Sequence, residues 1–359
     1  METKIVLGFA FGDEGKGRTV HKLCREALQL NKKPLVIRYS GGPQCGHRVV
    51  CNDVSHVFAS FGSGSLLNVP TKYIGGYIDP ISMFLEYREL LSLGLKIPYP
   101  IISKECMFIT HYDIMYGRND SKIISDGTCG KGIFPTFKRY NDKLFGGFTP
   151  NYKNISEYLE LCRDYYNYPK NNYLDRRYIQ YFNEIMNHQE ESDYDCLIFE
   201  GSQGLLLDME HGFMPHCTPS KVGLNGISKK YLTEDTEVYL VTRPYLTRHG
   251  NGYNPKYGEL VNNTFTLEEP TNLDYGYQGK FKRGIFDIDL LNVAIKRHNL
   301  LDYNVEYNLV LTHMDCVKHD YIYFLNKEEI YGGSVDSFLI AINNNLNLKF
   351  SRNIYSYSE

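Results

Sequence analysis

The sequence predicts an α/β fold in which a mainly parallel central sheet carries a P-loop-like phosphate loop and helical insertions. Short apolar runs alternate with longer amphipathic stretches along the 359 residues, as expected for parallel strands joined by helices. Turns that carry glycine or chargeable side chains follow at least five of the apolar runs. Since open α/β sheets bind ligands beyond the carboxyl ends of their strands, these turns predict one site built from loops.

The elements expected in the first half follow from the spacing of apolar residues. Strands are expected at 4–11, 34–40 and 73–79. Helical segments are expected at 15–31, 81–93 and 154–190, the last of them a Tyr-rich peripheral layer. The first helix is indicated by Val20, Cys24 and Ala27, which share one face. Between these elements, residues 48–60 are expected to form a hairpin that turns at Asn52-Asp53.

The second half repeats the alternation of strands and helices. Strands are expected at 196–199, 237–242 and 307–312, and helices at 287–298 and 334–346. Residues 270–284 are expected to form a polar loop that contains glycine and lysine. Since we find no linker and no internal repeat, we expect residues 1–359 to form a single domain, with helical insertions around 80–125 and 150–190.

Composition excludes several classes of protein. The 39 basic and 42 acidic residues give a net charge of −3, which argues against a nucleic-acid partner. No apolar run approaches the roughly 20 residues of a membrane span, and the N-terminus lacks the basic region of a signal peptide. The nine cysteines are odd in number and contain no C-x-x-C pair. Reduced thiols and a cytoplasmic location are therefore expected.

A phosphate-binding loop is predicted where the first strand meets the first helix. The loop consists of Gly12, Asp13, Glu14, Gly15, Lys16, Gly17 and Arg18. Glycines let backbone N–H groups point inward, the helix N-terminus adds partial positive charge, and Lys16 adds a full charge. An ordinary P-loop has glycine at Ala10 and a hydroxyl at Gly17 as a Mg²⁺ ligand, so Asp13 either replaces that ligand or acts as a base. A glycine-rich surface turn without a ligand is the competing interpretation.

Four turns taken together resemble the adenylosuccinate synthetase family. They are Gly12–Gly17, Gly41–His47, Gly127–Ile133 and Phe199–Asp208. The resemblance runs in order from residue 4 to about 315, and each motif alone is much less specific than the set. It implies a carbon–nitrogen ligase of purine biosynthesis that works as a homodimer. The final residues match the family poorly.

The resemblance also implies a two-step reaction with Mg²⁺ as cofactor. A base removes the N1 proton of a 6-oxopurine nucleotide, the 6-oxygen attacks the γ-phosphate of a triphosphate, and the amine of aspartate displaces the phosphoryl group. By resemblance, Asp13 is the general base and a Mg²⁺ ligand together with the Gly46 carbonyl. His47 is the general acid, a pairing with Asp13 that suits proton transfer at one reacting atom.

The remaining site residues are assigned by resemblance to three ligands. The triphosphate is expected at Gly12, Asp13, Glu14, Gly15, Lys16, Gly17, Arg18, Gly46, His47, His313 and Asp315. The purine monophosphate is expected at Asp13, Gln44, Cys45, Thr128, Cys129, Lys143, Gln203 and Thr218. Aspartate is expected at Gly279, Lys280, Phe281 and Lys282. Arg139 competes with Lys143 as the residue that reaches the phosphate site of a partner subunit.

Departures from the family pattern concern the substrate. Lys280 and Lys282 stand where the family has arginines, and a lysine does not reproduce bidentate binding. Gln44 and Cys45 replace the usual Asn and Ala, and His313 replaces a lysine. These changes resemble the bacteriophage branch that makes the 2-aminoadenine precursor, and for a viral protein the expected location is the cytoplasm of the host.

The substrates expected from that branch are dGMP, L-aspartate and ATP or dATP, and the product is N6-succino-2-amino-2′-deoxyadenylate. An ordinary adenylosuccinate synthetase, which uses IMP, aspartate and GTP, is the alternative. A nucleotide switch of the GTPase kind is a third interpretation, which the broken Walker loop disfavours.

Overall fold

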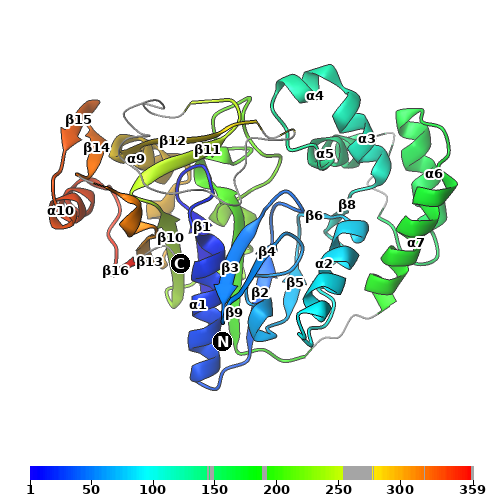
Figure 1. The fold of residues 1–359 in the computed structure, drawn as a ribbon, viewed down its shortest axis with the longest axis horizontal. Coiled ribbons are helices and arrows are strands. Elements are labelled where there is room, and N and C mark those ends of the chain that lie inside the picture. The colour runs from blue at the N-terminus through cyan, green and yellow to red at the C-terminus, as the bar shows by residue number, and fades with distance from the viewer. Residues whose placement is uncertain are drawn as a thin grey trace. The chain divides into compact units, whose positions relative to one another are not determined.

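The computed structural model describes residues 1–143, 145, 149–187, 192–253, 277, 279–318 and 320–356 (Figure 1). The chain divides into two compact units. The first comprises residues 1, 20–200 and 276–278, and the second comprises residues 2–19, 201–275 and 279–359. Each unit is described by itself below, and the single domain expected from the sequence stays a prediction.

The eight-stranded main sheet confirms the predicted α/β class. Its strand order is β16-β13-β10-β1-β9-β2-β5-β7, and the described pairings within it are parallel. The strands are β1 (Glu2–Gly8), β2 (Pro34–Arg38), β5 (Thr71–Tyr73), β7 (Ile101–Ile102), β9 (Cys196–Gly204), β10 (Thr236–Thr242), β13 (Glu306–Leu311) and β16 (Arg352–Tyr355). Uninterrupted apolar runs such as Ile5, Val6 and Leu7 are fully buried, as strands covered on both faces must be.

In the first unit, β2 pairs with β5 on one side and with residues 196–200 of β9 on the other. The predicted hairpin is confirmed as β3 (His47–Cys51) and β4 (Val54–Phe58), with Asn52 and Asp53 both at positive φ in the turn. The strand expected at 73–79 is wrong as one element. It breaks at Gly76, where an added Cβ would lie 2.5 Å from the Gly41 carbonyl oxygen. After the break, β6 (Tyr77–Ile78) pairs with β8 (Met107–Phe108) instead.

Helices form most of the rest of the first unit. They are α2 (Pro80–Ser92), α3 (His111–Asn119), α4 (Ser121–Ser125), α5 (Ile133–Asn141), α6 (Ile155–Tyr166) and α7 (Asn172–Asn187). The helical segment expected at 154–190 is two helices, because Asn167 adopts a left-handed φ of 53° and ends α6. The helices α6 and α7 lie side by side, and α7 also packs against α2 (Figure 1). Residues 188–190 lie outside the described residues.

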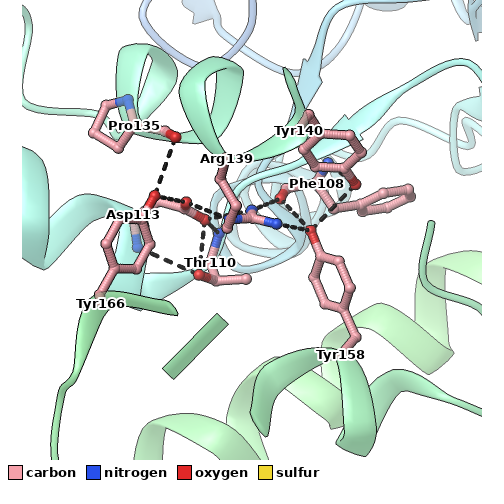
Figure 2. Close-up of polar contacts among 8 residues, drawn as sticks. All are labelled: Phe108, Thr110, Asp113, Pro135, Arg139, Tyr140, Tyr158 and Tyr166. Atoms are coloured by element: carbon pink, nitrogen blue, oxygen red, sulfur yellow. Dashed lines mark hydrogen bonds and ion pairs between the residues drawn. The ribbon is translucent and has the colours of Figure 1, made fainter. Parts of the chain in front are cut away.

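A buried ion pair joins α3 and α5 (Figure 2). Arg139 donates to both carboxylate oxygens of Asp113 at 2.8 and 2.9 Å, and also to Tyr158 Oη at 3.1 Å and the Phe108 carbonyl oxygen at 3.0 Å. Tyr166 Oη donates to Asp113 at 2.8 Å. Both charged side chains are fully buried. Arg139 is therefore internal to this unit and does not extend from the surface, as a residue that reaches a partner subunit must. Lys143 is exposed.

The second unit contains the other half of the main sheet and a four-stranded sheet. The smaller sheet has the order β11-β12-β14-β15, with strands β11 (Tyr245–His249), β12 (Phe281–Asp287), β14 (Ile322–Leu325) and β15 (Glu328–Tyr331). The loop expected at 270–284 is wrong from residue 281 onward, because β12 pairs with β11 in antiparallel register. Residues 270–276 and 278 lie outside the described residues.

The predicted helices of the second unit are confirmed as α9 (Ile288–Arg297) and α10 (Val335–Asn345). Asp287 caps the first of them by accepting from Leu290 N at 2.8 Å, and Ser334 caps the second. The helix α1 (Lys16–Gln29) begins in this unit at the end of the glycine-rich loop. Short 3₁₀ turns occur at Ser65–Leu67, Leu205–Leu207, Leu224–Gly226, Lys229–Tyr231, Leu300–Asp302 and Met314–Cys316. Among the described residues, no helix combines the length and the apolar character needed to cross a membrane.

We expect Arg139→Met to destabilise the protein by about 3–5 kcal/mol, because it leaves the Asp113 carboxylate buried without its ion-pair partner. Urea unfolding of both proteins at pH 7 measures the difference. The matched control is Arg163→Met, whose guanidinium pairs with the exposed Asp164 and is worth no more than about 1 kcal/mol. If both variants lose the same free energy of unfolding, the buried pair stabilises the protein no more than the exposed pair does.

Candidate active site

The predicted phosphate loop lies between β1 and α1, as expected. Gly12, Asp13 and Gly15 adopt positive φ values of 100°, 56° and 91°, so the loop turns tightly before the helix starts at Lys16. Gly15 has no room for a side chain, because an added Cβ would lie 2.9 Å from Thr312 Cγ2. This strand, turn and helix form the local geometry that binds phosphate through backbone N–H groups.

Three hydrogen bonds hold the loop in its conformation. Thr247 Oγ1 donates to the Gly12 carbonyl oxygen at 2.6 Å, and Thr312 Oγ1 donates to the Glu14 carbonyl oxygen at 2.7 Å. The Glu14 carboxylate accepts from Ala10 N at 2.6 Å and occupies the space that a Cβ on Gly8 would need. Burial raises the pKa of Glu14 to about 7, against the opposing charge of Lys16. Because this side chain points inward, a contact between Glu14 and a triphosphate involves its backbone.

Asp13 is held differently from its neighbour. Its Oδ2 lies 3.1 Å from His249 Nε2, and about a third of its side chain is exposed. Burial acts to raise the pKa of Asp13, but the hydrogen bond and charge of His249, together with Lys16 and Arg243, outweigh it and lower the pKa. The carboxylate is therefore ionised at neutral pH, which suits both a general base and a ligand for a hard cation.

His249 is a site residue that the sequence analysis missed. It ends β11, and its ring packs against Phe281 with 5.0 Å between the centroids. The antiparallel pairing of β11 with β12 sets His249 opposite Phe281 and Arg248 opposite Lys282. No local signal marks His249, because its partner Asp13 lies 236 positions earlier in the chain.

The lysine-containing segment expected to bind aspartate is anchored to the same strand. Gly250 N donates to the Lys280 carbonyl oxygen at 2.9 Å, and Gly279 has a positive φ of 75°. Phe281 and Lys282 belong to β12. The structure thus brings the segment next to His249 and, through His249, into the neighbourhood of Asp13.

Gln203 also lies beside the phosphate loop. An added Cβ on Gly12 would lie 3.8 Å from Gln203 Cα and 3.6 Å from Gly204 N, so the end of β9 packs directly against the loop backbone. Ser202 Oγ donates to Gln203 Oε1 at 2.6 Å and holds its amide. Thr218, the other predicted contact in this unit, donates its backbone N–H to the Leu207 carbonyl oxygen at 2.9 Å.

Asp208 organises the turn that follows β9. Its carboxylate accepts backbone N–H groups from Glu210 at 2.8 Å, His211 at 3.1 Å and Val222 at 2.7 Å. Asp208, Glu210 and His211 place ligand atoms within 4.8 Å of one another. Glu210 also pairs with Lys221 at 2.8 Å. These contacts explain the grouping of Asp208, Glu210 and His211 by a structural role, because they stabilise the turn.

The turn that contains His313 lies at the end of β13. His313 has a left-handed φ of 56°, and its Nδ1 lies 2.8 Å from Thr312 Oγ1. Burial, with the charges of Arg243 and Arg18, lowers the pKa of His313 to about 2. Asp315, two residues further, is exposed. The imidazole is therefore neutral and joined to the phosphate loop through Thr312.

In the first unit, His47 forms a buried dyad with Glu200. His47 Nδ1 lies 2.7 Å from Glu200 Oε1, and the Glu200 carboxylate is fully buried. Ser63 N donates to Glu200 Oε2 at 3.1 Å, and Ser63 Oγ donates to Oε1. Burial acts to raise the pKa of Glu200, but His47, Arg38 and Ser63 outweigh it and lower the pKa to about 2. Glu200 therefore fixes the orientation of the His47 ring through Nδ1.

Glu200 belongs to a motif that the sequence analysis quoted without giving this residue a role. The available signal was a carboxylate at the end of a fully buried strand, directly before Gly201 and the predicted Gln203. A charge in that position requires a partner. Which partner it has depends on the parallel pairing of β9 with β2 and on the hairpin that follows β2.

The side-chain amide of Gln44 independently indicates a ligand. Its Nε2 and Oε1 are both buried, and neither has a hydrogen-bond partner among the described residues. Buried amide groups are normally satisfied, so an orphan pair in a glycine-rich turn fits a polar ligand with both a donor and an acceptor, such as a purine edge. Cys45 is buried in the same turn, and Gly46 is exposed.

The third glycine-rich turn precedes α5. Gly127 and Gly130 have positive φ values of 79° and 66°, and Thr128 and Cys129 between them are partly buried. Arg118 Nε donates to the Gly130 carbonyl oxygen at 3.0 Å. Burial raises the pKa of Cys129 to about 11, so its thiol is protonated at neutral pH.

Comparisons with known proteins point to one family. The family model for adenylosuccinate synthetase matches residues 5–337. Adenylosuccinate synthetases of Francisella philomiragia and Francisella tularensis are 29% identical over 92% of this chain and 83% of theirs.

Two solved structures share the fold. Fully ligated adenylosuccinate synthetase from Plasmodium falciparum has a TM-score of 0.74 and 18% identity, and the match covers 98% of this chain and 96% of that one. Cyanophage S-2L succinoaminodeoxyadenylate synthetase (PurZ), bound to dGMP and dATP as an energy donor, has a TM-score of 0.59 and 15% identity, with coverage of 99% and 93%.

We expect Glu200→Gln to destabilise the protein most near neutral pH. The lowered pKa of Glu200 means that its stabilisation is fully present above the unfolded value of about 4.5 and is lost as pH falls towards 2. The full difference is on the order of 3 kcal/mol. Urea unfolding of both proteins between pH 7 and pH 3.5 measures it. A pH-independent difference would contradict the assignment, and Glu210→Gln, at a more exposed pair, is the control.

Proposed function

Because the chain belongs to the adenylosuccinate synthetase family, we propose that it joins L-aspartate to C6 of a 6-oxopurine nucleoside monophosphate and hydrolyses a nucleoside triphosphate. The family membership makes it a carbon–nitrogen ligase. The observation that supports the proposal most is the ionised Asp13 in the phosphate loop, held by His249 beside the lysine-containing segment.

The residues suit the successive proton and phosphoryl transfers. Asp13 takes the N1 proton of the purine, which makes the 6-oxygen a nucleophile towards the γ-phosphate. Lys16 lies 3% exposed at the start of α1 and offsets the charge of the transferring phosphoryl group. His47 Nε2 donates to the purine 6-oxygen or the γ-phosphate, and Glu200 fixes the ring for this role. The amine of aspartate then displaces phosphate from C6.

Magnesium fits the oxygen donors that we propose for it. Asp13 is an ionised, partly exposed carboxylate whose His249 contact uses only Oδ2, and Gly46 is an exposed residue with a backbone carbonyl. Hard oxygen ligands of this kind hold Mg²⁺. When bound, the ion supplies charge neutralisation on the triphosphate.

We propose IMP as the first acceptor, since the Francisella relatives matched over most of the chain are adenylosuccinate synthetases. The second candidate is dGMP, which the S-2L structure contains. Lys280 and Lys282 in the aspartate segment favour it, because a flexible lysine is a poorer bidentate partner for a 2′-hydroxyl than an arginine. The orphan amide of Gln44 is compatible with either base edge.

The acceptor is tested by kcat/KM for IMP, GMP and dGMP with aspartate, Mg²⁺ and ATP, following phosphate and the succinylated product. One unpaired polar group costs about 1–3 kcal/mol, so we expect the preferred nucleotide to lead by roughly 10–100-fold. The highest kcat/KM for IMP supports the first candidate, and a kcat/KM for dGMP above those of both ribonucleotides supports the second. In the same assays, Lys280→Arg should raise kcat/KM for the ribonucleotides relative to dGMP. Asp13→Asn supplies the inactive baseline.

We further propose that the enzyme is a cytoplasmic homodimer whose Lys143 contacts the phosphate site of the partner subunit. The exposure of Lys143 supports that reach, and the burial of Arg139 favours Lys143 over Arg139. The nine free cysteines support a reducing compartment.

Mixing Asp13→Asn with Lys143→Ala tests the shared site. If each variant alone is nearly inactive, random exchange of subunits makes half of the dimers hybrids, and one of the two sites in each hybrid is intact. Activity should then recover to about a quarter of wild type, as closed two-fold assembly requires. Light scattering confirms the dimer during the assay. A mixture that stays inactive, or a fully active monomer, would contradict the shared site.

A further inference from the structure

Residues 59–63 form a largely buried segment that belongs to neither a helix nor a strand. The segment follows β4, whose last residue Phe58 is the strand partner of His47. Backbone polar groups that are buried outside regular structure need other hydrogen-bond partners. Here side chains from other parts of the first unit supply most of these partners, namely Arg38, Thr71, Tyr73, Glu86 and Glu200.

The Glu86 carboxylate of α2 holds the first half of the segment. It accepts the backbone N–H groups of Ala59 at 3.2 Å, Ser60 at 2.6 Å and Phe61 at 3.1 Å. Tyr73 Oη donates to the Ser60 carbonyl oxygen at 2.8 Å. Because three consecutive N–H groups share one carboxylate, the backbone that leads from β4 towards Ser63 is fixed in its conformation.

Ser63 ends the segment and binds Glu200 through two groups. Its N–H donates to Glu200 Oε2 at 3.1 Å, and its hydroxyl donates to Oε1. His47 Nδ1 lies 2.7 Å from the same Oε1. Ser63 therefore fixes the plane of the carboxylate, and with it the direction in which Oε1 faces His47. Gly62 N donates to Thr71 Oγ1 at 2.8 Å, so the residue before Ser63 is held as well.

We propose that Ser63 is a positioning residue of the general-acid step, which acts through Glu200 to hold the His47 ring. This inference rests on the proposed function, in which His47 is the general acid. The Ser63 side chain is fully buried, and the single hydrogen of its hydroxyl is given to Glu200. A general acid must lie within hydrogen-bond reach of the atom that it protonates, and a misplacement of about 1 Å costs up to about 100-fold in rate.

The test measures kcat and the KM of each substrate on the full-length enzyme, with the preferred acceptor nucleotide, aspartate, Mg²⁺ and ATP. We expect Ser63→Ala to lower kcat by about 10–100-fold and to leave the KM values unchanged, because Ser63 acts on His47 and not on substrate binding. Ser65→Ala is the matched control. The Ser65 hydroxyl is also buried, but it has no hydrogen-bond partner among the described residues, so its removal should keep the wild-type kcat.

A double substitution separates positioning from a general structural role. A residue that acts through His47 has no effect on the rate once His47 is absent. We therefore expect Ser63→Ala to leave the residual kcat of His47→Ala unchanged. A wild-type kcat in Ser63→Ala, an equal loss in Ser65→Ala, or a loss by the same factor with and without His47 would overturn the proposal.

A measurement without turnover distinguishes this inference from the ligase function. In protein that carries isotope-labelled histidine, the nuclear magnetic resonance signals of the His47 ring are assigned by their loss in His47→Gln. They should shift in Ser63→Ala and keep their positions in Ser65→Ala. If wild-type enzyme forms no product with any acceptor nucleotide, the ligase function is wrong, and a shift would still support the hold of Ser63 on His47. Unchanged His47 signals in Ser63→Ala would overturn the proposal whether or not the enzyme ligates.

Discussion

The site depends on a phosphate loop that the rest of the second unit holds at three points. Two threonine hydroxyls, from β11 and from the residue after β13, donate to loop carbonyl oxygens, and the Glu14 carboxylate accepts from the backbone of Ala10, just after β1. A glycine-rich turn has many accessible conformations, so without such braces its N–H groups would not stay aimed at one point.

The surroundings of the two adjacent carboxylates in the loop shift their pKa values in opposite directions. Glu14 faces the interior, and burial raises its pKa to about 7. Asp13 faces His249, Lys16 and Arg243, and its pKa is lowered. One acid is thereby suited to structure and the other to proton transfer or metal binding, although they are neighbours in the chain. Environments that separate two titratable groups in this way are typical of sites that perform acid–base chemistry.

Each proposed catalytic side chain has a dedicated partner. Asp13 is paired with His249, and His47 is paired with a buried Glu200 that two groups of Ser63 also hold. A partner limits the rotation of the side chain and selects which of its atoms remains for substrate. Gln44, Lys280 and His313, where the sequence analysis expects departures from the family pattern, lie outside these pairs.

The sequence by itself determined the local elements and the class of chemistry. A strand, a glycine-rich turn and a helix are short-range features, so their spacing predicts a phosphate loop, and uninterrupted apolar runs predict buried parallel strands. Tertiary structure decided which side chains meet. His249 meets Asp13 because β11, which it ends, contacts the phosphate loop through Thr247. Arg139, which the sequence leaves open as a surface contact, is buried against Asp113. Periodicity reports whether a residue is buried, and it does not report the partner, because the partner is chosen by contacts between segments far apart in the chain.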